Sequence, residues 1–164
     1  MTAGAARPAL EIATRYTTRR KAFGRTIADF QGVSFQVAEA AMLLDVSNSM
    51  IYSTARAVDA GIDSGRVRRM ISQTKKFVAE SCQKVAHNAM QVMGGIGYTN
   101  IYPIERIHRD LRLASIWTGT NEIMSMIIAT EWYKEYKKAA EHPLTRDYEP
   151  DAAGANDVDE KVFE

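Results

Sequence analysis

The segment of this chain best suited to bind an anion is Gln91-Val92-Met93-Gly94-Gly95-Ile96-Gly97-Tyr98, which contains three closely spaced glycines. Glycine adopts positive φ without steric cost and lets another molecule approach the main chain. Backbone N–H groups turned outward in such a segment can form a nest for phosphate. The alternative is structural, because the segment follows a long apolar-periodic stretch and a glycine commonly ends a helix. Taken alone, the segment is compatible with both interpretations.

A second group combines basic and aromatic residues in Arg20-Lys21-Ala22-Phe23-Gly24, followed by Ile27 and by Phe30-Gln31. Arginine suits a pyrophosphate because its planar guanidinium donates two hydrogen bonds at once and stays charged at all working pH values. The alternative is that Arg19, Arg20 and Lys21 form the solvated basic end of a helix, where the helix dipole favours positive charge.

The third group is Thr118-Gly119-Thr120-Asn121-Glu122, which directly precedes a predicted helix. Thr120 or Asn121 can cap that helix, and the exposed amides at its start carry partial positive charge. A purely structural cap is the alternative. Glu122 suits the first turn of a helix for the same electrostatic reason.

The three groups occur in an order and at a spacing that resemble the C-terminal helical domain of the acyl-CoA dehydrogenase family. Tyr102-Pro103-Ile104-Glu105-Arg106 and Arg109-Asp110 lie between them and extend the resemblance. It runs from about residue 4 to about residue 136 and covers a little under half of a usual family chain. A glycine motif that follows a helix rather than a strand argues against a nucleotide fold of the strand-turn-helix kind, and so against NAD.

The resemblance implies that FAD is the cofactor and that Arg20 contacts its pyrophosphate. Positions that would line the adenosine part of FAD or its surroundings are Phe23, Ile27, Phe30 and Gln31. A second set would contact the dinucleotide from the neighbouring subunit: Gln91, Val92, Met93, Gly94 and Gly95. The site would therefore be shared between copies of the chain, which the family commonly joins through this domain as a dimer of dimers.

By the same resemblance, Thr120 and Glu122 align with positions near the cofactor, and the peptide amide of Gly119 would lie near the substrate. The family reaction removes a proton next to a thioester carbonyl and so requires a carboxylate base. Many members place that glutamate immediately before the Gly-Thr pair, but Thr118 stands here, and its hydroxyl has no useful basicity near neutral pH. Other members place the base at the start of the first helix, a position that extrapolates upstream of Met1. We therefore assign no catalytic residue.

Helical periodicity predicts segments at about 2–20, 30–60 and 66–93, a shorter helix at about 104–113, and a further helix to about 138. Pro8 is expected either to kink the first helix or to start it. Long helices with short links and no alternating strand pattern predict an all-α antiparallel four-helix bundle. The bundle domain is expected at 1–140. Residues 141–164 are rich in Pro, Gly, Asp and Glu and are expected to form a polar tail or arm.

Composition narrows the functional classes. Lys and Arg number 21 against 20 Asp and Glu, so no net field attracts nucleic acid or an anionic membrane. The single Cys82 cannot form an intramolecular disulfide and is expected to be a buried small residue. The three histidines lack partners at metal-ligand spacing, so we expect no metal site. No segment has the length of a membrane span, and the start lacks the features of a signal peptide, so a cytoplasmic location is expected.

Three hypotheses follow. In the first, the chain is the FAD-binding, oligomerising C-terminal domain of an acyl-CoA dehydrogenase, incapable of the whole reaction alone. It would meet acyl-CoA through the complete enzyme, associate with copies of itself as a dimer or tetramer, and pass electrons to electron-transfer flavoprotein. In the second, it is a non-catalytic assembly or scaffold module derived from that family. In the third, it is a plain helical bundle whose glycine turn and basic helix end are structural.

Overall fold

Six α-helices and one small β-hairpin make up residues 1–140, the part of the chain that the computed structural model describes. The helices are α1 (Thr2–Thr17), α2 (Gln31–Asp59), α3 (Ser64–Met93), α4 (Gly95–Tyr98), α5 (Ile104–Leu113) and α6 (Asn121–Ala140). The strands are β1 (Lys21–Ala22) and β2 (Arg25–Thr26), followed by a single 3-10 turn at Ile27–Asp29. The polar tail expected at 141–164 lies outside the described residues.

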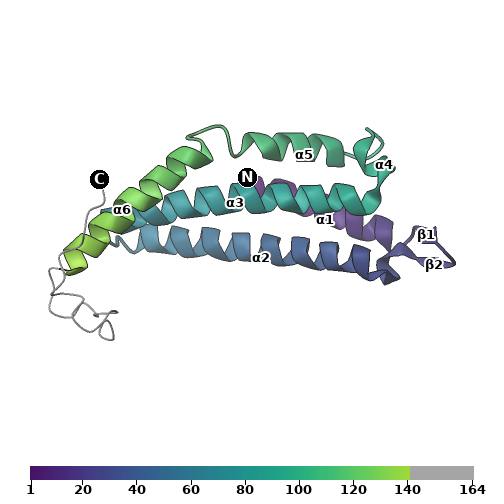
Figure 1. Cartoon of the computed structure of the whole chain (residues 1–164), viewed down its shortest axis with the longest axis horizontal. Coiled ribbons are helices and arrows are strands. Elements are labelled where there is room, and N and C mark those ends of the chain that lie inside the picture. Colours follow the sequence, from purple (N-terminus) through teal and green to yellow (C-terminus); the bar gives the residue numbers. More distant parts are fainter. Residues whose placement is uncertain (141–164) are drawn as a thin grey trace, which may run out of the picture.

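Helices α2 and α3 form a long antiparallel hairpin that runs the length of the bundle (Figure 1). The link between them ends at Asp63, whose side chain caps α3 by accepting hydrogen bonds from the backbone N–H groups of Gly65 and Arg66, each at 3.1 Å. Farther along the hairpin, the hydroxyls of Thr54 and Thr74 bond to each other at 2.6 Å. Capping and this cross-hairpin bond satisfy polar groups that would otherwise weaken the pairing.

Small side chains fill the core where α1, α2 and α3 meet, which allows the helices to approach closely. The fully buried members include Ala6, Cys82, Val85 and Ala86. The expectation for Cys82 is confirmed, and its burial raises the pKa of the thiol to about 11. A second cluster around the fully buried Ile104 joins α5 to the ends of α1 and α3.

The all-α class is confirmed, with two refinements. α5 and α6 share the fourth position of the bundle, because α5 packs on the C-terminal half of α3 and α6 on its N-terminal half (Figure 1). The link between α1 and α2 contains the β-hairpin, which the sequence did not predict. Pro8 does not start α1 but lies inside it. None of the helices in residues 1–140 has the length and apolar character needed to cross a membrane.

Candidate functional site

The β-hairpin places the basic and aromatic group at one end of the bundle. Its tip is formed by Phe23 with φ of +52° and Gly24 with φ of +82°, the pair of positive angles that a tight two-residue turn requires. The N–H of Ile27 donates to the carbonyl of Arg20 at 2.9 Å and closes the hairpin at its base. The Arg20 side chain, which follows the end of α1, remains exposed. The hairpin therefore presents this guanidinium and an aromatic ring on one projecting element.

Phe23 is 94% exposed, which is exceptional for a large apolar side chain. Its ring lies 6.2 Å from that of Phe30 in an edge-to-face arrangement, and the guanidinium of Arg25 stacks 3.9 Å from the centre of the Phe30 ring. Ile27 lies in the 3-10 turn, and Gln31 is the exposed first residue of α2. This surface suits a flat aromatic ligand that brings negative charge, because rings and cations alternate across it.

A hollow of about 390 Å³ lies beside Arg20. Its lining combines three arginines with two tyrosines and one residue of the glycine segment: Arg15, Arg19, Arg20, Tyr16, Tyr102 and Ile96. Tyr16 and Tyr102 contact edge to face at 6.2 Å between ring centres. The lining residues include no carboxylate, so the hollow favours an anion. Sequence analysis assigned no binding role to Arg15 or Tyr102. Arg15 lies in the last turn of α1, and Arg19 follows the end of that helix at Thr17.

The glycine segment ends α3 as expected. Gly94 has φ of +64° and ψ of −147°, a conformation that is essentially restricted to glycine. A Cβ atom placed at Gly94 or Gly95 would meet no atom within 4 Å, so the main chain there is open to an approaching molecule. Gly97 differs, because a Cβ there would lie 2.9 Å from the carbonyl oxygen of Met90. The third glycine therefore serves close packing rather than exposure.

The side chains of this segment divide in the same way. Gln91 is exposed, whereas Val92 and Met93 are buried in the cluster around Ile104. Of the five candidates proposed here for dinucleotide contact, Gln91, Gly94 and Gly95 are thus the ones with accessible surface.

The loop between α5 and α6 holds the third group. Thr118 has φ of +50° and Gly119 has φ of +89°, so two consecutive residues are left-handed. The N–H of Ile123 donates to the Thr120 hydroxyl at 3.4 Å, which makes Thr120 the side-chain cap of α6. The pKa of the exposed Glu122 carboxyl is lowered, mainly by a hydrogen bond from its own backbone N–H and then by one from the Thr120 hydroxyl. An ionised Glu122 in the first turn of α6 is the arrangement that the helix dipole favours.

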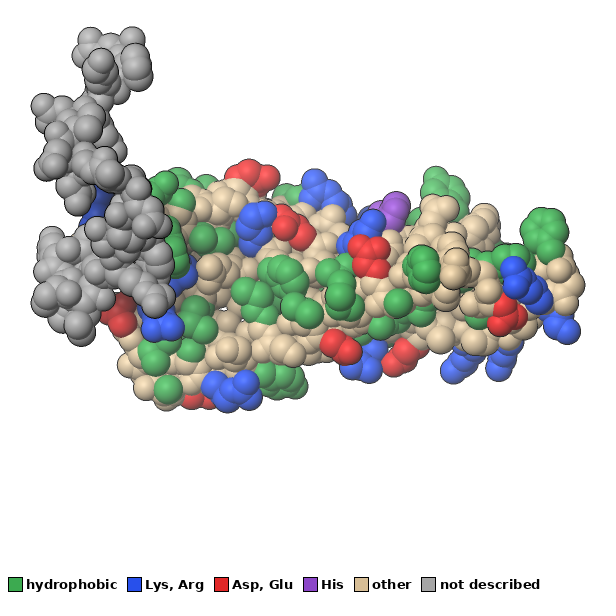
Figure 2. Space-filling model, turned by 60° about the horizontal axis from the view of Figure 1, so that its bottom comes forward, with side chains coloured by type: hydrophobic (Ala, Val, Ile, Leu, Met, Phe, Trp, Pro, Cys, Tyr) green, Lys and Arg blue, Asp and Glu red, His purple; other side chains and the backbone are tan. Residues whose placement is uncertain are grey.

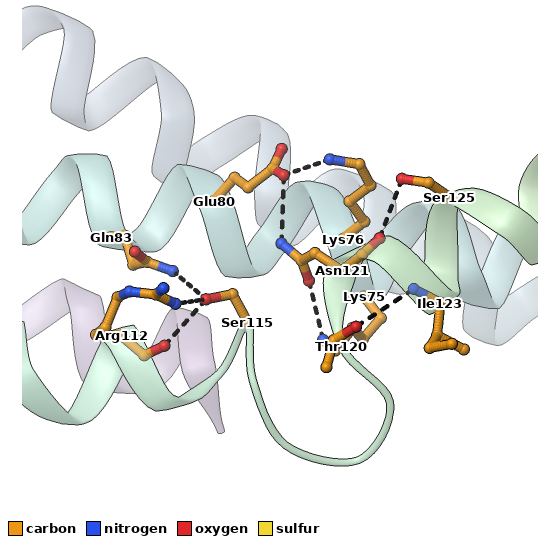
Figure 3. A network of polar contacts seen from close by, with 10 residues as sticks. All are labelled: Lys75, Lys76, Glu80, Gln83, Arg112, Ser115, Thr120, Asn121, Ile123 and Ser125. Atoms are coloured by element: carbon orange, nitrogen blue, oxygen red, sulfur yellow. Dashed lines mark hydrogen bonds and ion pairs between the residues drawn. The ribbon is translucent and has the colours of Figure 1, made fainter.

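A polar network attaches both ends of this loop to α3 (Figure 3). At the α6 end, the side chain of Asn121 accepts a hydrogen bond from Lys75 Nζ at 2.9 Å and donates one to Glu80 at 3.2 Å. At the α5 end, Gln83 Nε2 donates to the hydroxyl of Ser115 at 2.9 Å. Sequence reasoning did not select these α3 residues, because charged and amide side chains on an amphipathic helix are usually solvated.

The two regions are separate on one chain. The Arg20 group and Gly94 lie at the C-terminal end of α3, whereas the Thr118 loop is held by Lys75 and Glu80 (Figures 1 and 3). At about 1.5 Å per helical residue, they are roughly 20–30 Å apart along α3. Among residues 1–140, no group of three or more His, Cys, Asp or Glu is arranged to hold a metal ion.

Residues 1–132 match the family model of the acyl-CoA dehydrogenase C-terminal domain. Among curated relatives, an acyl-CoA dehydrogenase of Bacillus subtilis is 38% identical over 126 residues, which cover 77% of this chain and 32% of that protein. A 3-(aryl)acrylate reductase of Clostridium sporogenes is 36% identical over 131 residues, which cover 80% of this chain and 34% of that protein. The chain thus spans about a third of the length of these relatives.

Solved structures also superpose on most of this chain. An acyl-CoA dehydrogenase from Geobacillus kaustophilus superposes with a TM-score of 0.74 at 32% identity, over 80% of this chain and 34% of that one. The FAD complex of PigA superposes with a TM-score of 0.75 at 26% identity, over 80% of this chain and 33% of that one.

Proposed function

Because the chain belongs to the acyl-CoA dehydrogenase family through its C-terminal domain, we propose that it binds FAD and joins copies of itself within an acyl-CoA-oxidising enzyme. Members of the family are FAD flavoproteins. The observation that carries the proposal is the pairing, at one end of the bundle, of a projecting exposed arginine and aromatic ring with an open glycine turn.

The residue types at this end of the bundle match the chemical groups of FAD. Arg20 would hold the pyrophosphate, and Phe23 and Phe30 offer ring faces or edges to the adenosine part, with Ile27 and Gln31 beside them. Gly94 and Gly95 leave the main chain accessible to a large ligand, and Gln91 can add a polar contact. Thr120 and Glu122 would lie near the other end of the cofactor. When bound, FAD supplies the capacity to accept a hydride.

Self-association follows from the same arrangement. The family is oligomeric. The Arg20 group and the glycine segment were expected to come from different subunits, but both lie at the same end of one chain, where Arg20 and Ile96 line one hollow. We therefore propose that these two groups contact FAD from one copy and that the Thr118 loop, roughly 20–30 Å away along α3, comes from a second copy. On α2, Phe35, Met42 and Val46 fall on one stripe at helical spacing and are 65%, 57% and 45% exposed. Figure 2 shows apolar side chains exposed along this face of the bundle. We propose that a second copy covers them, as a dimer or a tetramer.

On the substrate side, the amide of Gly119 would face the thioester of an acyl-CoA. The reaction of the complete enzyme would form an α,β double bond in that acyl group. The Clostridium sporogenes relative is named a 3-(aryl)acrylate reductase, so we include the reverse reaction, reduction of such a double bond, in the proposed class of reactions. The family has links to electron-transfer flavoprotein, which is the electron partner we propose. Thr118 cannot remove the α-proton, so the base would come from outside residues 1–140.

A second candidate function is a non-catalytic assembly module, and Thr118 is the observation that favours it. The two candidates make different predictions for a longer chain, extended upstream of Met1 to the full length of the curated relatives. Dehydrogenation of acyl-CoA by that chain supports the enzyme, whereas background activity with FAD fully bound supports the module.

Titration of the chain with FAD, followed by flavin fluorescence, tests the proposal. Arg20→Ala should weaken binding by about tenfold to a hundredfold, since a hydrogen-bonded charge on the pyrophosphate is lost. The matched control is Arg68→Ala, which removes a similarly exposed arginine whose described partner is Glu131 at 3.5 Å. The control should bind as the unchanged chain does. Equal losses in the two variants would remove the assignment of Arg20.

A further inference from the structure

The turn at Thr118 adopts a backbone conformation that its residue type disfavours. Thr118 is β-branched and has φ of +50°, in the left-handed region that such residues rarely enter. A strained residue of this kind persists only where surrounding contacts over-determine it, and it often marks a functional site.

The turn is closed across its two ends and then attached to α3. The backbone N–H of Asn121 donates to the carbonyl of Ser115 at 3.0 Å, which joins the end of the loop to its beginning. Asn121 is only 6% exposed, so its side-chain amide needs partners within the protein. Lys75 and Glu80 supply them, one on the oxygen and one on the nitrogen (Figure 3).

Of the α3 residues in this network, Lys75 is the one that lines the same hollows as Thr118. The two hollows have volumes of about 460 and 560 Å³. Partial burial lowers the pKa of the Lys75 ammonium, and the charges of Glu122 and Glu80 act in the opposite direction. Lys76, the next residue, instead pairs with Glu80 and reaches Asn121 only through that carboxylate.

We propose that Lys75 is a positioning residue, which holds the Asn121 side chain so that the Thr118–Gly119 turn keeps its left-handed conformation and presents its amides to the ligand. The part that concerns ligand binding rests on the proposed function. The part that concerns the turn does not, because it can be measured without any ligand.

Hydrogen exchange of the backbone amide of Asn121, followed by NMR on the whole chain, tests the turn directly. Lys75→Met keeps the length of the side chain but removes the donor, and the Asn121 amide should exchange about tenfold faster as a charged hydrogen bond is lost. Lys76→Met is the matched control and should change exchange less than twofold, since its link to Asn121 is indirect. The amide of Val85, in the C-terminal half of α3, should be unchanged in both variants.

Equal acceleration in Lys75→Met and Lys76→Met would overturn the assignment. So would a rise at Val85 equal to that at Asn121, because the variant would then destabilise the whole bundle rather than the turn.

Titration with FAD then examines the connection to the ligand. Lys75→Met should bind FAD about tenfold more weakly than Lys76→Met if the turn must be held for binding. Lost protection at Asn121 with unchanged FAD affinity would refute that connection. If the chain without any substitution binds no FAD, that result counts against the proposed function. The comparison of hydrogen exchange in Lys75→Met and Lys76→Met would still decide whether Lys75 holds the turn.

Discussion

Alanine substitutions at Gly94 and Gly95 separate backbone strain from every other effect of adding a methyl group. A Cβ at either position meets no atom within 4 Å, so neither substitution creates a clash. The two residues differ in conformation, because Gly94 has φ of +64° and ψ of −147° whereas Gly95 begins the helical residues of α4 and has no positive φ. The comparison therefore isolates the backbone energy at the end of α3.

Gly94→Ala should destabilise the chain by about 1–3 kcal/mol, which is the usual range for a residue forced into such a region. At about 4 °C per kcal/mol for a domain of this size, Tm should fall by roughly 4–12 °C. Gly95→Ala should be neutral or should stabilise by up to about 1 kcal/mol, because alanine restricts the unfolded chain without straining the folded one.

Thermal unfolding followed by circular dichroism measures both variants, at one protein concentration because self-association would otherwise contribute to Tm. Tm values that agree within a degree or two would show that Gly94 is not held in the left-handed conformation.

Two further predictions concern the core. Ile104→Ala should lower the free energy of unfolding by about 2–5 kcal/mol in urea titrations, because Ile104 is fully buried. Ile101 is 69% exposed, so Ile101→Ala should change that free energy by less than about 0.5 kcal/mol. Similar losses in the two variants would contradict the burial of Ile104 in the core. The Cys82 thiol has its pKa raised from 9.0 to about 11, so the stability linked to it is present below pH 9 and lost as pH rises through 11. That loss should reach about 2–3 kcal/mol well above pH 11 relative to Cys82→Ala, and a parallel pH dependence in the two chains would refute it.

Much of the fold could be predicted from sequence because its determinants are local. The end of α3 at Gly94 and the capping of α6 by Thr120 depend on residues within a few positions of each other. The burial of Cys82 follows from a helical stripe on the same helix. Such features need only the periodicity of one helix and the chemistry of its ends.

The candidate site was predictable only in part. The Arg20 group and the glycine turn were recognisable as contiguous motifs, but the partners of the Thr118 loop were not. Lys75 is 46 positions from Asn121, and nothing near either residue indicates that they meet. The projection of Phe23 into solvent depends on a six-residue hairpin, whose strands of two residues each are too short to show an alternating pattern.

Spacing along the chain was thus enough to predict the helices, the end of α3 at Gly94 and the types of residue available for an anionic cofactor. The end of α1 was not predicted in this way, since the helix stops at Thr17 rather than near residue 20. Tertiary structure alone decided which glycines stay open. Gly97 packs against Met90 whereas Gly94 and Gly95 face free space, and only the packing of α4 on α3 distinguishes them. It also decided how the Thr118 turn is held, since a buried amide such as that of Asn121 finds its partners wherever the fold brings them.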